Sequence, residues 1–284
     1  MHSKIIWITG AGGLIGNCLV KTGAAYAAGA EIIGLTRDQV DLTDFDSVCR
    51  MFSKTSPQMI IHCAALTKSP ACQADPPLAR KLNVEVTSRL AELASKIPFV
   101  FFSTDLVFDG RQGNYDETAS VNPLGVYAET KVAAEQIVFA NPRHTVIRTS
   151  LNGGNSPTGD RGFNEQLRRA WQDHQTIKLF TDEFRSPIPA AFTARAVWEL
   201  ILQEKPGLYH IAGSERLSRW QIGQLIASRW PRLNPKLLES SLKDYSGAPR
   251  APDTSLNCAK AQKLLSFPLP RLSDWLAAHP AELF

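Results

Sequence analysis

Residues 4–16 read KIIWITGAGGLIG, and this stretch decides the fold. Residues 5–8 are all apolar, which is typical of a strand buried on both faces. Gly10, Gly13 and Gly16 follow at a spacing of three. In a dinucleotide-binding fold such glycines permit the tight turn, the approach of backbone to a pyrophosphate, and close packing of the next helix on the sheet. The stretch therefore predicts a strand, a glycine turn and a helix that bind a dinucleotide.

The helix after this turn is expected to be amphipathic. Leu14, Ile15, Cys18 and Leu19 recur at helical spacing, and the first turn of such a helix offers free N–H groups to an anion. A glycine-rich turn between two core elements is the alternative. The order of strand, glycines and amphipathic helix favours the binding function.

The composition is that of a soluble globular protein with one large domain or two unequal ones. The chain has 284 residues, of which 44% are hydrophobic and 20% charged. No apolar run approaches the roughly 18 to 20 residues that span a bilayer, and the first predicted strand begins without room for a signal peptide. We therefore expect a cytoplasmic protein without membrane interaction.

Cysteine usage and charge exclude several classes of function. The cysteines are five in number and lack paired short spacings, so we expect reduced, buried thiols, no disulfide framework and no bound metal. The net charge of +4 comes without basic runs interleaved with aromatics, which argues against nucleic-acid binding. Basic residues are concentrated in residues 143–284, which favours an anionic substrate, although an ordinary solvated surface explains the same excess.

The second predicted strand, residues 31–35, ends where a dinucleotide fold meets the adenosine ribose. An acid at this position binds the 2′-hydroxyl, and an arginine accommodates a 2′-phosphate. Thr36 stands where the acid is expected, and Arg37 follows it. The sequence therefore favours NADPH over NADH. Asp41, a few residues later, either reaches the adenine or serves as a turn residue.

Two helices are predicted after this point. Thr43 and Asp46 have the spacing of a capping box for a helix that runs to about Phe52. A longer helix over residues 76–96 begins with two prolines, which suit a first helical turn.

Residues 58–63 and 98–103 are further apolar runs that predict buried strands. Strands that alternate with helices imply crossover connections, a parallel sheet and a ligand crevice beyond the carboxyl ends of the strands. Thr104 lies at such an end. Ala64 and Ala65 follow the preceding strand and are small enough to let a cofactor lie against the backbone.

Tyr127 and Lys131 are four residues apart in a predicted helix, so they share one face. Tyrosine titrates near about 10, but a neighbouring ammonium stabilises the phenolate and lowers the pKa. The pair can then exchange a proton with a carbonyl or an alcohol. A solvated surface pair is the alternative, which the preceding dinucleotide fold and Thr104 disfavour.

Three motifs together resemble those of the extended short-chain dehydrogenases, and most closely the dTDP-4-dehydrorhamnose reductases. The motifs are TGAGGLIG at 9–16, STDLVFDG at 103–110 and YAETK at 127–131. Shorter similarities extend over nearly the whole chain, at DLTD (41–44), NVEVT (83–87), IRTS (147–150) and PRAPDTSLN (249–257).

The resemblance implies that Thr104, Tyr127 and Lys131 are catalytic and that Lys131 also holds the nicotinamide ribose. It implies a cofactor site lined by Gly10, Gly13, Leu14, Ile15, Gly16, Arg37, Asp41, Leu42, Ala64, Ala65, Asn83, Ser103, Tyr127 and Lys131. The chain departs from the family pattern at three candidate substrate contacts. Leu106 and Leu151 replace aromatic residues, and Arg185 in the loop 182–189 replaces a small one.

The resemblance implies an α/β fold of the Rossmann type, with a doubly wound parallel sheet and a smaller C-terminal α/β substrate-binding region. We assign residues 1–150 to the dinucleotide-binding domain, to which residues of about 188–213 return through a strand. Residues 151–187 and 214–284 are assigned to the substrate region, with residues 151–160 as a flexible loop over the active site.

These features predict an NADPH-dependent reductase of a 4-keto nucleotide sugar. Tyr127 would donate a proton to the keto oxygen, Thr104 would hydrogen-bond that oxygen, and Lys131 would keep Tyr127 acidic. A nucleotide-sugar epimerase is the alternative among enzymes, whereas Leu106 in place of the usual Glu disfavours a dehydratase. The alternative outside enzymes is an NADP-binding regulatory subunit, because the family also resembles the β subunit of methionine adenosyltransferase. The sugar stays undetermined, and a homodimer stays open.

Overall fold

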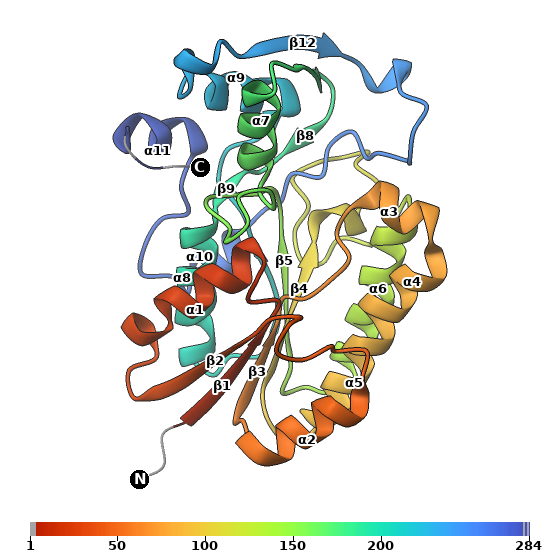
Figure 1. Cartoon of the computed structure of the whole chain (residues 1–284), viewed down its shortest axis with the longest axis vertical. Coiled ribbons are helices and arrows are strands. Elements are labelled where there is room, and N and C mark those ends of the chain that lie inside the picture. Colours follow the sequence, from red (N-terminus) through yellow and green to blue (C-terminus); the bar gives the residue numbers. More distant parts are fainter. Residues whose placement is uncertain (1–3, 281, 283) are drawn as a thin grey trace.

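The structure is a computed structural model that describes residues 4–280, 282 and 284. A central sheet of six parallel strands separates two layers of helices, and elements from the second half of the chain lie beyond one end of the sheet (Figure 1). From one edge to the other, the strands are β2 (Ala30–Leu35), β1 (Lys4–Thr9), β3 (Met59–His62), β4 (Phe99–Thr104), β5 (Thr145–Thr149) and β10 (Gly207–Ile211). The strand order reverses at β1, so the predicted doubly wound Rossmann-type sheet is confirmed.

Helices cover both faces of the sheet (Figure 1). One face packs against α1 (Leu14–Tyr26), α8 (Ala190–Leu202) and the short α10 (Ala259–Gln262). The other face packs against α2 (Phe45–Thr55), α5 (Val86–Leu93) and α6 (Val126–Phe139). Because both faces are covered, the strands are apolar on both sides, as their uninterrupted apolar runs predict.

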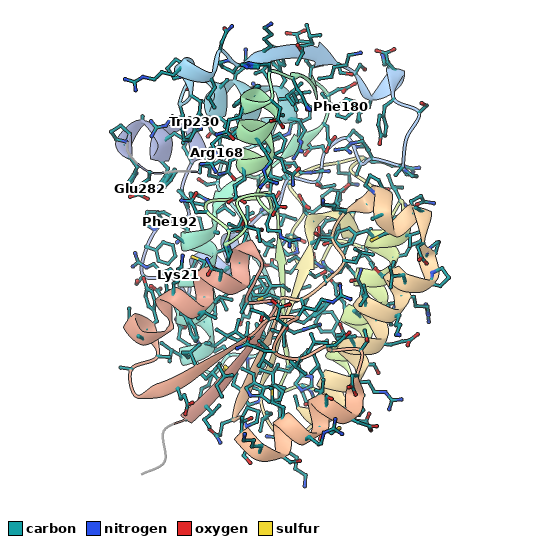
Figure 2. The ribbon with its side chains drawn as sticks, in the orientation of Figure 1. Lys21, Arg168, Phe180, Phe192, Trp230 and Glu282 are labelled. Carbon is teal, nitrogen blue, oxygen red and sulfur yellow. The ribbon has the colours of Figure 1, made fainter. Side chains whose placement is uncertain are left out.

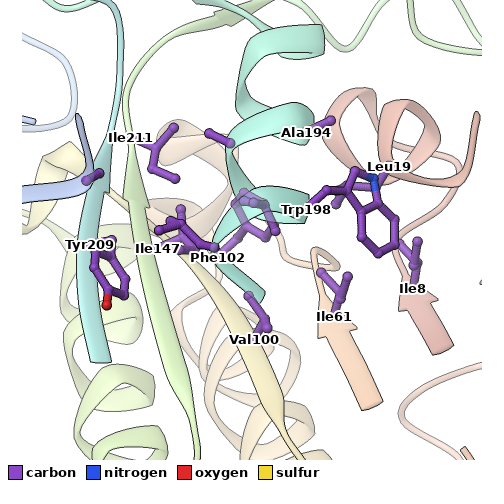
Figure 3. Packing of buried hydrophobic residues seen from close by; sticks show 14 of the residues in the cluster. Ile8, Leu19, Ile61, Val100, Phe102, Ile147, Ala194, Trp198, Tyr209 and Ile211 are labelled. Atoms are coloured by element: carbon purple, nitrogen blue, oxygen red, sulfur yellow. The ribbon is translucent and has the colours of Figure 1, made fainter. Parts of the chain in front are cut away.

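The first of these interfaces holds a large apolar cluster (Figure 3). Ile8, Ile61 and Phe102 of the sheet meet Leu19 of α1 and Trp198 of α8. The indole of Trp198 also donates a hydrogen bond to the Thr22 hydroxyl, at 3.0 Å. The segment around α8 and β10 therefore completes the sheet and its cover, although it follows the predicted first domain in the chain. Phe267 and Leu269, which were assigned to the substrate region, lie in the same cluster.

The helix predicted over residues 76–96 contains a change of helical type. After α3 (Ser69–Ala74), it begins as α4 (Pro76–Arg80), widens into a π-helical turn over Lys81–Glu85, and continues as α5. A regular helix would place Leu78 on one face with Leu82 and Val86, but Leu78 is 42% exposed because the wider turn changes the spacing. Such turns occur frequently at functional sites.

The start of α2 differs from the predicted capping box. Asp44, rather than Thr43, caps the helix, and its carboxylate accepts hydrogen bonds from the Ser47 N–H at 3.1 Å and from the Ser47 hydroxyl. Thr43 instead binds Asp41 within the preceding turn. A carboxylate satisfies a helix N–H as well as a hydroxyl does, so two candidate caps one residue apart compete.

Beyond the carboxyl end of the sheet, three helices and three strand pairs form a smaller layer (Figure 1). Within it, Arg168 lies over the Trp230 ring at 5.4 Å (Figure 2). Its helices are α7 (Phe163–Gln172), α9 (Arg219–Ala227) and α11 (Leu272–Ala278). Its strand pairs are β7 (Thr176–Phe180) with β12 (Lys236–Ser240), β8 (Phe184–Arg185) with β11 (Leu217–Ser218), and β6 (Asn152–Gly153) with β9 (Ile188–Pro189). Short 3-10 turns cover Asp105–Val107, Pro231–Leu233 and Leu242–Asp244.

The cysteines in the described residues are free thiols, and only Cys72 is fully buried, whereas the other four are partly exposed. Among the same residues, no helix is both long and apolar enough to cross a membrane. The described side chains also contain no group of three His, Cys, Asp or Glu residues placed to hold a metal ion.

Candidate active site

The glycine turn connects β1 to α1 and lies against the residues that follow β3. Gly10 has φ of +69°, and a side chain there would collide with the backbone of Ala64, whose N would lie 2.7 Å from the added Cβ. A side chain at Gly16 would collide with the Gly10 carbonyl. Both glycines are therefore required by backbone contacts at this turn, and Ala64 lies directly against it.

The N-terminus of α1 opens onto this turn without any side-chain cap. Gly13 is the N-cap residue, its N–H donates to the Gly10 carbonyl at 2.8 Å, and the first turn contains no acidic residue. At Gly12 the space for a Cβ is open, with Thr36 nearest at 4.0 Å. Free helix N–H groups beside a cradle without side chains fit a pyrophosphate. The predicted Leu14 and Ile15 form the first turn of the same helix.

The carboxyl ends of β2 and β4 supply further predicted cofactor residues. Arg37 is exposed just after β2. At the end of β4, Ser103 is 4% exposed, and its hydroxyl has no hydrogen-bond partner among the described residues. A buried hydroxyl without a partner costs free energy, which a polar group of a bound molecule would recover. The Ser103 hydroxyl, like the uncapped N-terminus of α1, therefore fits a bound cofactor.

Asp41 serves as a turn residue, which is one of the two roles that the sequence allows. Its Oδ1 accepts hydrogen bonds from the Thr43 N–H at 2.9 Å and from the Thr43 hydroxyl at 2.8 Å, which hold the pKa of Asp41 below its usual value. Arg37 and Lys81 lower this pKa further through their charges, so two cations lie near Asp41. The adjacent Leu42 packs against the apolar cluster beneath α2.

Asn83 lies in the π-helical turn and is 1% exposed. Its amide oxygen accepts from the Leu66 N–H at 2.7 Å, and its amide nitrogen donates to the Leu66 carbonyl at 3.1 Å and to the Thr130 hydroxyl at 3.0 Å. Thr130 in turn donates to the Tyr127 carbonyl at 2.7 Å. The side chain of Asn83 therefore holds the loop of Leu66, beyond Ala65, against the helix of Tyr127.

Thr104 is 7% exposed at the end of β4, and its hydroxyl lies beside Tyr127. The hydroxyl donates to Asp105 Oδ1 and accepts from the Leu106 N–H, each at 3.2 Å. The structure therefore brings two of the three predicted catalytic residues together.

The pKa of Tyr127 is raised above its ordinary value, mainly because burial disfavours the phenolate. The Thr104 hydroxyl lowers the pKa in part, and the charge of Asp105 raises it. The expectation that Lys131 lowers this pKa is wrong for the cofactor-free protein. Tyr127 is therefore fully protonated at neutral pH, which is the state that a proton donor requires.

Lys131 is 2% exposed, and its Nζ lies 3.9 Å from the centroid of the Phe101 ring. Burial lowers the pKa of Lys131 to about 7, against smaller increases from Glu135 and Cys63. In turn, the charge of Lys131 adds to the burial that lowers the pKa of His62 to about 3. A buried amine poised near neutrality is typical of catalytic sites.

A small pocket lies beside Tyr127. Leu106, Leu124 and Pro249 line it together with small and uncharged residues. Leu106 thus lines this pocket, and its contact with substrate stays a prediction. Leu151, by contrast, packs into the apolar cluster of α7, α9 and α11, outside the residues that line this pocket.

Arg185 is 6% exposed, and protein groups surround its guanidinium. It binds Glu183 Oε1 at 2.8 Å, donates to the Thr254 hydroxyl, and lies 3.8 Å from Asp105 Oδ2. Arg250 binds the other oxygen of Glu183 at 2.6 Å. Arg185 therefore ties the end of β4 to the smaller layer of the molecule.

Arg219 completes this cluster, and sequence reasoning missed it. Its guanidinium lies 3.7 Å from the centroid of the Phe163 ring and has no hydrogen bond or ion pair within the part of the chain that is described. Burial lowers the pKa of Arg219 to about 10, while Glu183 and Asp105 raise it and the other two arginines lower it. Arg185 and Arg250 thus bind the carboxylates of Glu183 and Asp105. Among the described residues of this cluster, Arg219 is the arginine without an ion pair.

The doubly wound sheet, the glycine turn and the family match given next define an oxidoreductase of the extended short-chain dehydrogenase type. The chain matches the RmlD substrate binding domain family over residues 3–282 and belongs to that family.

Individual relatives match nearly the whole chain. The chain is 29% identical over 288 residues to a protein of Haloferax volcanii named probable low-salt glycan biosynthesis reductase Agl14, with 96% of each chain covered. It is 28% identical to the dTDP-4-dehydrorhamnose reductase of Mycolicibacterium smegmatis, covering 98% of this chain and 84% of that one. Among solved structures, the dTDP-4-dehydrorhamnose reductase of Bacillus anthracis in complex with NADP has a TM-score of 0.86 at 24% identity and covers 98% of both chains.

A relative from a different functional class also matches. The β subunit of methionine adenosyltransferase 2 from Rattus norvegicus is 25% identical to the chain, with 92% of this chain and 83% of that one covered. The relatives of this chain therefore include proteins with both kinds of name.

Proposed function

We propose that the protein is an NADPH-dependent reductase of a 4-keto nucleotide sugar. The observation that carries the proposal is the placement of Thr104 and a protonated Tyr127 beside a pocket without charged side chains. Relatives over nearly the full chain that are named dTDP-4-dehydrorhamnose reductase support this substrate class.

The glycine turn and the α1 N-terminus would hold the pyrophosphate of NADPH, and Arg37 its 2′-phosphate. Ser103 and Lys131 would bind near the nicotinamide ribose. When bound, this cofactor supplies the hydride for the keto carbon.

The side chains of the site complete the reduction. Tyr127 donates its hydroxyl proton to the keto oxygen, and the Thr104 hydroxyl turns from Asp105 to orient that oxygen by a hydrogen bond. The resulting phenolate has lost its proton in a buried site, where its pKa is high.

The anionic part of the substrate requires a cation outside the uncharged pocket. Arg219 is the unpaired guanidinium of the described cluster, and we assign the substrate phosphates to it. Arg185 does not compete for the phosphates, because Glu183 and Asp105 hold its guanidinium.

The proposal is tested by NADPH oxidation across a panel of 4-keto nucleotide sugars, with Tyr127→Phe as the inactive control. Turnover with at least one sugar, together with release of one NADP⁺ per sugar reduced, supports the reductase. Interconversion of sugars without net oxidation of cofactor would identify an epimerase instead.

A non-catalytic regulatory subunit is the second candidate, favoured by the similarity to the rat methionine adenosyltransferase β subunit. Co-elution of the purified protein with a partner enzyme at fixed stoichiometry, without NADPH oxidation on any sugar of the panel, would support it. The intact group of Thr104, Tyr127 and Lys131 favours catalysis.

A further inference from the structure

Lys131 and Glu135 lie one turn apart on α6, a spacing at which lysine and glutamate commonly form an ion pair. Both side chains are buried, with 2% of each residue exposed, so such a pair would be strong. Within the described residues, however, Lys131 forms no ion pair with any carboxylate. Its Nζ lies over the Phe101 ring at 3.9 Å, on the strand that ends in Thr104.

Arg148 of β5 accounts for this arrangement. Its Nε donates to Glu135 Oε1 at 2.9 Å, and its Nη2 donates to Oε2 at 2.7 Å, so both carboxylate oxygens are bound in a fork. Arg148 is itself 4% exposed. A buried bidentate pair is geometrically specific and leaves the carboxylate little freedom to turn toward a second cation.

Two further groups hold the Arg148 guanidinium. The ring of Phe108 lies 5.2 Å from Arg148 Cζ, and His210 Nε2 lies 3.5 Å from Nη1. Burial lowers the pKa of His210 to about 4, so its ring is neutral at pH 7. Its Nδ1 donates to the Tyr115 carbonyl at 3.0 Å, which leaves Nε2 as an acceptor facing Arg148.

We propose that Arg148 is a positioning residue for the active site. By binding both oxygens of Glu135, it prevents an ion pair between Glu135 and Lys131 and leaves the lysine ammonium over the Phe101 ring of β4. The inference rests on the proposed function only in treating Lys131 as a residue of the reaction.

The charges around Lys131 set the direction of the expected effects. Glu135 on its own helix and Cys63 after β3 raise the pKa of Lys131, burial lowers it, and His62 of β3 is neutral at pH 7. Releasing Glu135 from Arg148 would let it pair with Lys131 and raise that pKa. Removing the carboxylate of Glu135 would lower the pKa instead.

The experiment is an NMR titration of the lysine side chains in the cofactor-free protein, with the Lys131 signal assigned by its loss in Lys131→Met. We expect Arg148→Met to raise the pKa of Lys131 by about one unit or more, and Glu135→Gln to lower it. The same Arg148→Met substitution in the Glu135→Gln background should change the pKa far less, because no carboxylate is left to release. This double variant removes both charges of the Arg148–Glu135 pair together, so neither of the two is left buried without its partner.

Arg148→Lys provides the matched control for charge. It keeps the positive charge but cannot bind both oxygens in a fork, so the pKa of Lys131 should still rise. An unchanged pKa in both Arg148 variants would overturn the proposal, as would an equal rise with and without Glu135, which indicates simple loss of a distant charge. Since the titration uses neither substrate nor cofactor, its failure is distinguishable from failure of the proposed reductase activity.

Discussion

Replacing Lys131 with methionine should make the cofactor-free protein more stable at neutral pH while inactivating it. The ordinary pKa of lysine is 10.5, and burial lowers that of Lys131 to about 7 in the folded protein. At pH 7 this lysine is fully protonated in the unfolded chain but protonated in only about half of the folded molecules. Folding must therefore either release the proton or bury the charged ammonium, and both cost free energy. Methionine has a similar length and no charge, and it packs against Phe101 at no such cost.

The magnitude follows from the pKa difference. At about 1.4 kcal/mol per unit, the shift corresponds to a cost of roughly 4 kcal/mol at pH 7, which falls to roughly 1 kcal/mol at pH 10. Between pH 7 and pH 10 the unfolded state binds more protons at this site than the folded state does. The free energy of unfolding that the site contributes therefore rises with pH. The advantage of Lys131→Met over wild type should therefore shrink by roughly 3 kcal/mol from pH 7 to pH 10.

The assay is urea unfolding of both proteins at pH 7 and pH 10, so that groups common to both cancel in the difference. Lys21→Met is the control, because Lys21 is exposed in the middle of α1 (Figure 2). Its stability should differ little from that of wild type, because an exposed side chain carries no burial cost. A Lys131→Met protein less stable than wild type at pH 7, or a difference independent of pH, would refute the reasoning.

Three further substitutions test single residues of the site. Tyr127→Phe should leave NADPH affinity nearly unchanged and lower turnover at least about 100-fold, since it removes the proton donor and little volume; near-normal turnover in steady-state assays would contradict this role. Arg37→Ala should weaken NADPH by roughly 1.5 to 3 kcal/mol and NADH little, as measured by fluorescence titration, and equal weakening of both cofactors would rule out its contact with the 2′-phosphate. Arg219→Gln should raise KM for the nucleotide sugar about tenfold or more, whereas Arg216→Gln, which removes an exposed ion pair with Asp253, should not; equal KM values in the two variants would remove Arg219 from the substrate site.

The sheet was predictable because its determinants are local. The apolar run before Gly10 predicts a strand covered on both faces, and the glycines at 10 and 16 are needed where backbone segments touch. The helix of Tyr127 and Lys131 likewise ends at Phe139 as expected. These features depend on residues a few positions apart, which the sequence displays directly.

The parts that escaped prediction depend on contacts between distant segments. Arg219 is left without an ion pair among the described residues because Arg185 and Arg250 bind the nearby carboxylates. These residues are far apart in the sequence, so no local pattern reveals their contacts. The direction of the Tyr127 pKa depends on burial, which spacing along a helix does not reveal. The π-helical turn also lacks a local signal, since the apolar residues that run through it recur at a spacing that suits a regular helix equally well, at Leu78, Leu82, Val86 and Leu90.

The central claim, reduction of a keto sugar by hydride transfer with net consumption of NADPH, is tested most directly with NADPH deuterated at the transferable C4 position. After incubation with the sugar that gives turnover, mass spectrometry and NMR of the product should show one deuterium at the sugar carbon that carried the ketone, and one NADP⁺ per product. Product without deuterium, or deuterium retained in the cofactor while sugars interconvert, would contradict the account.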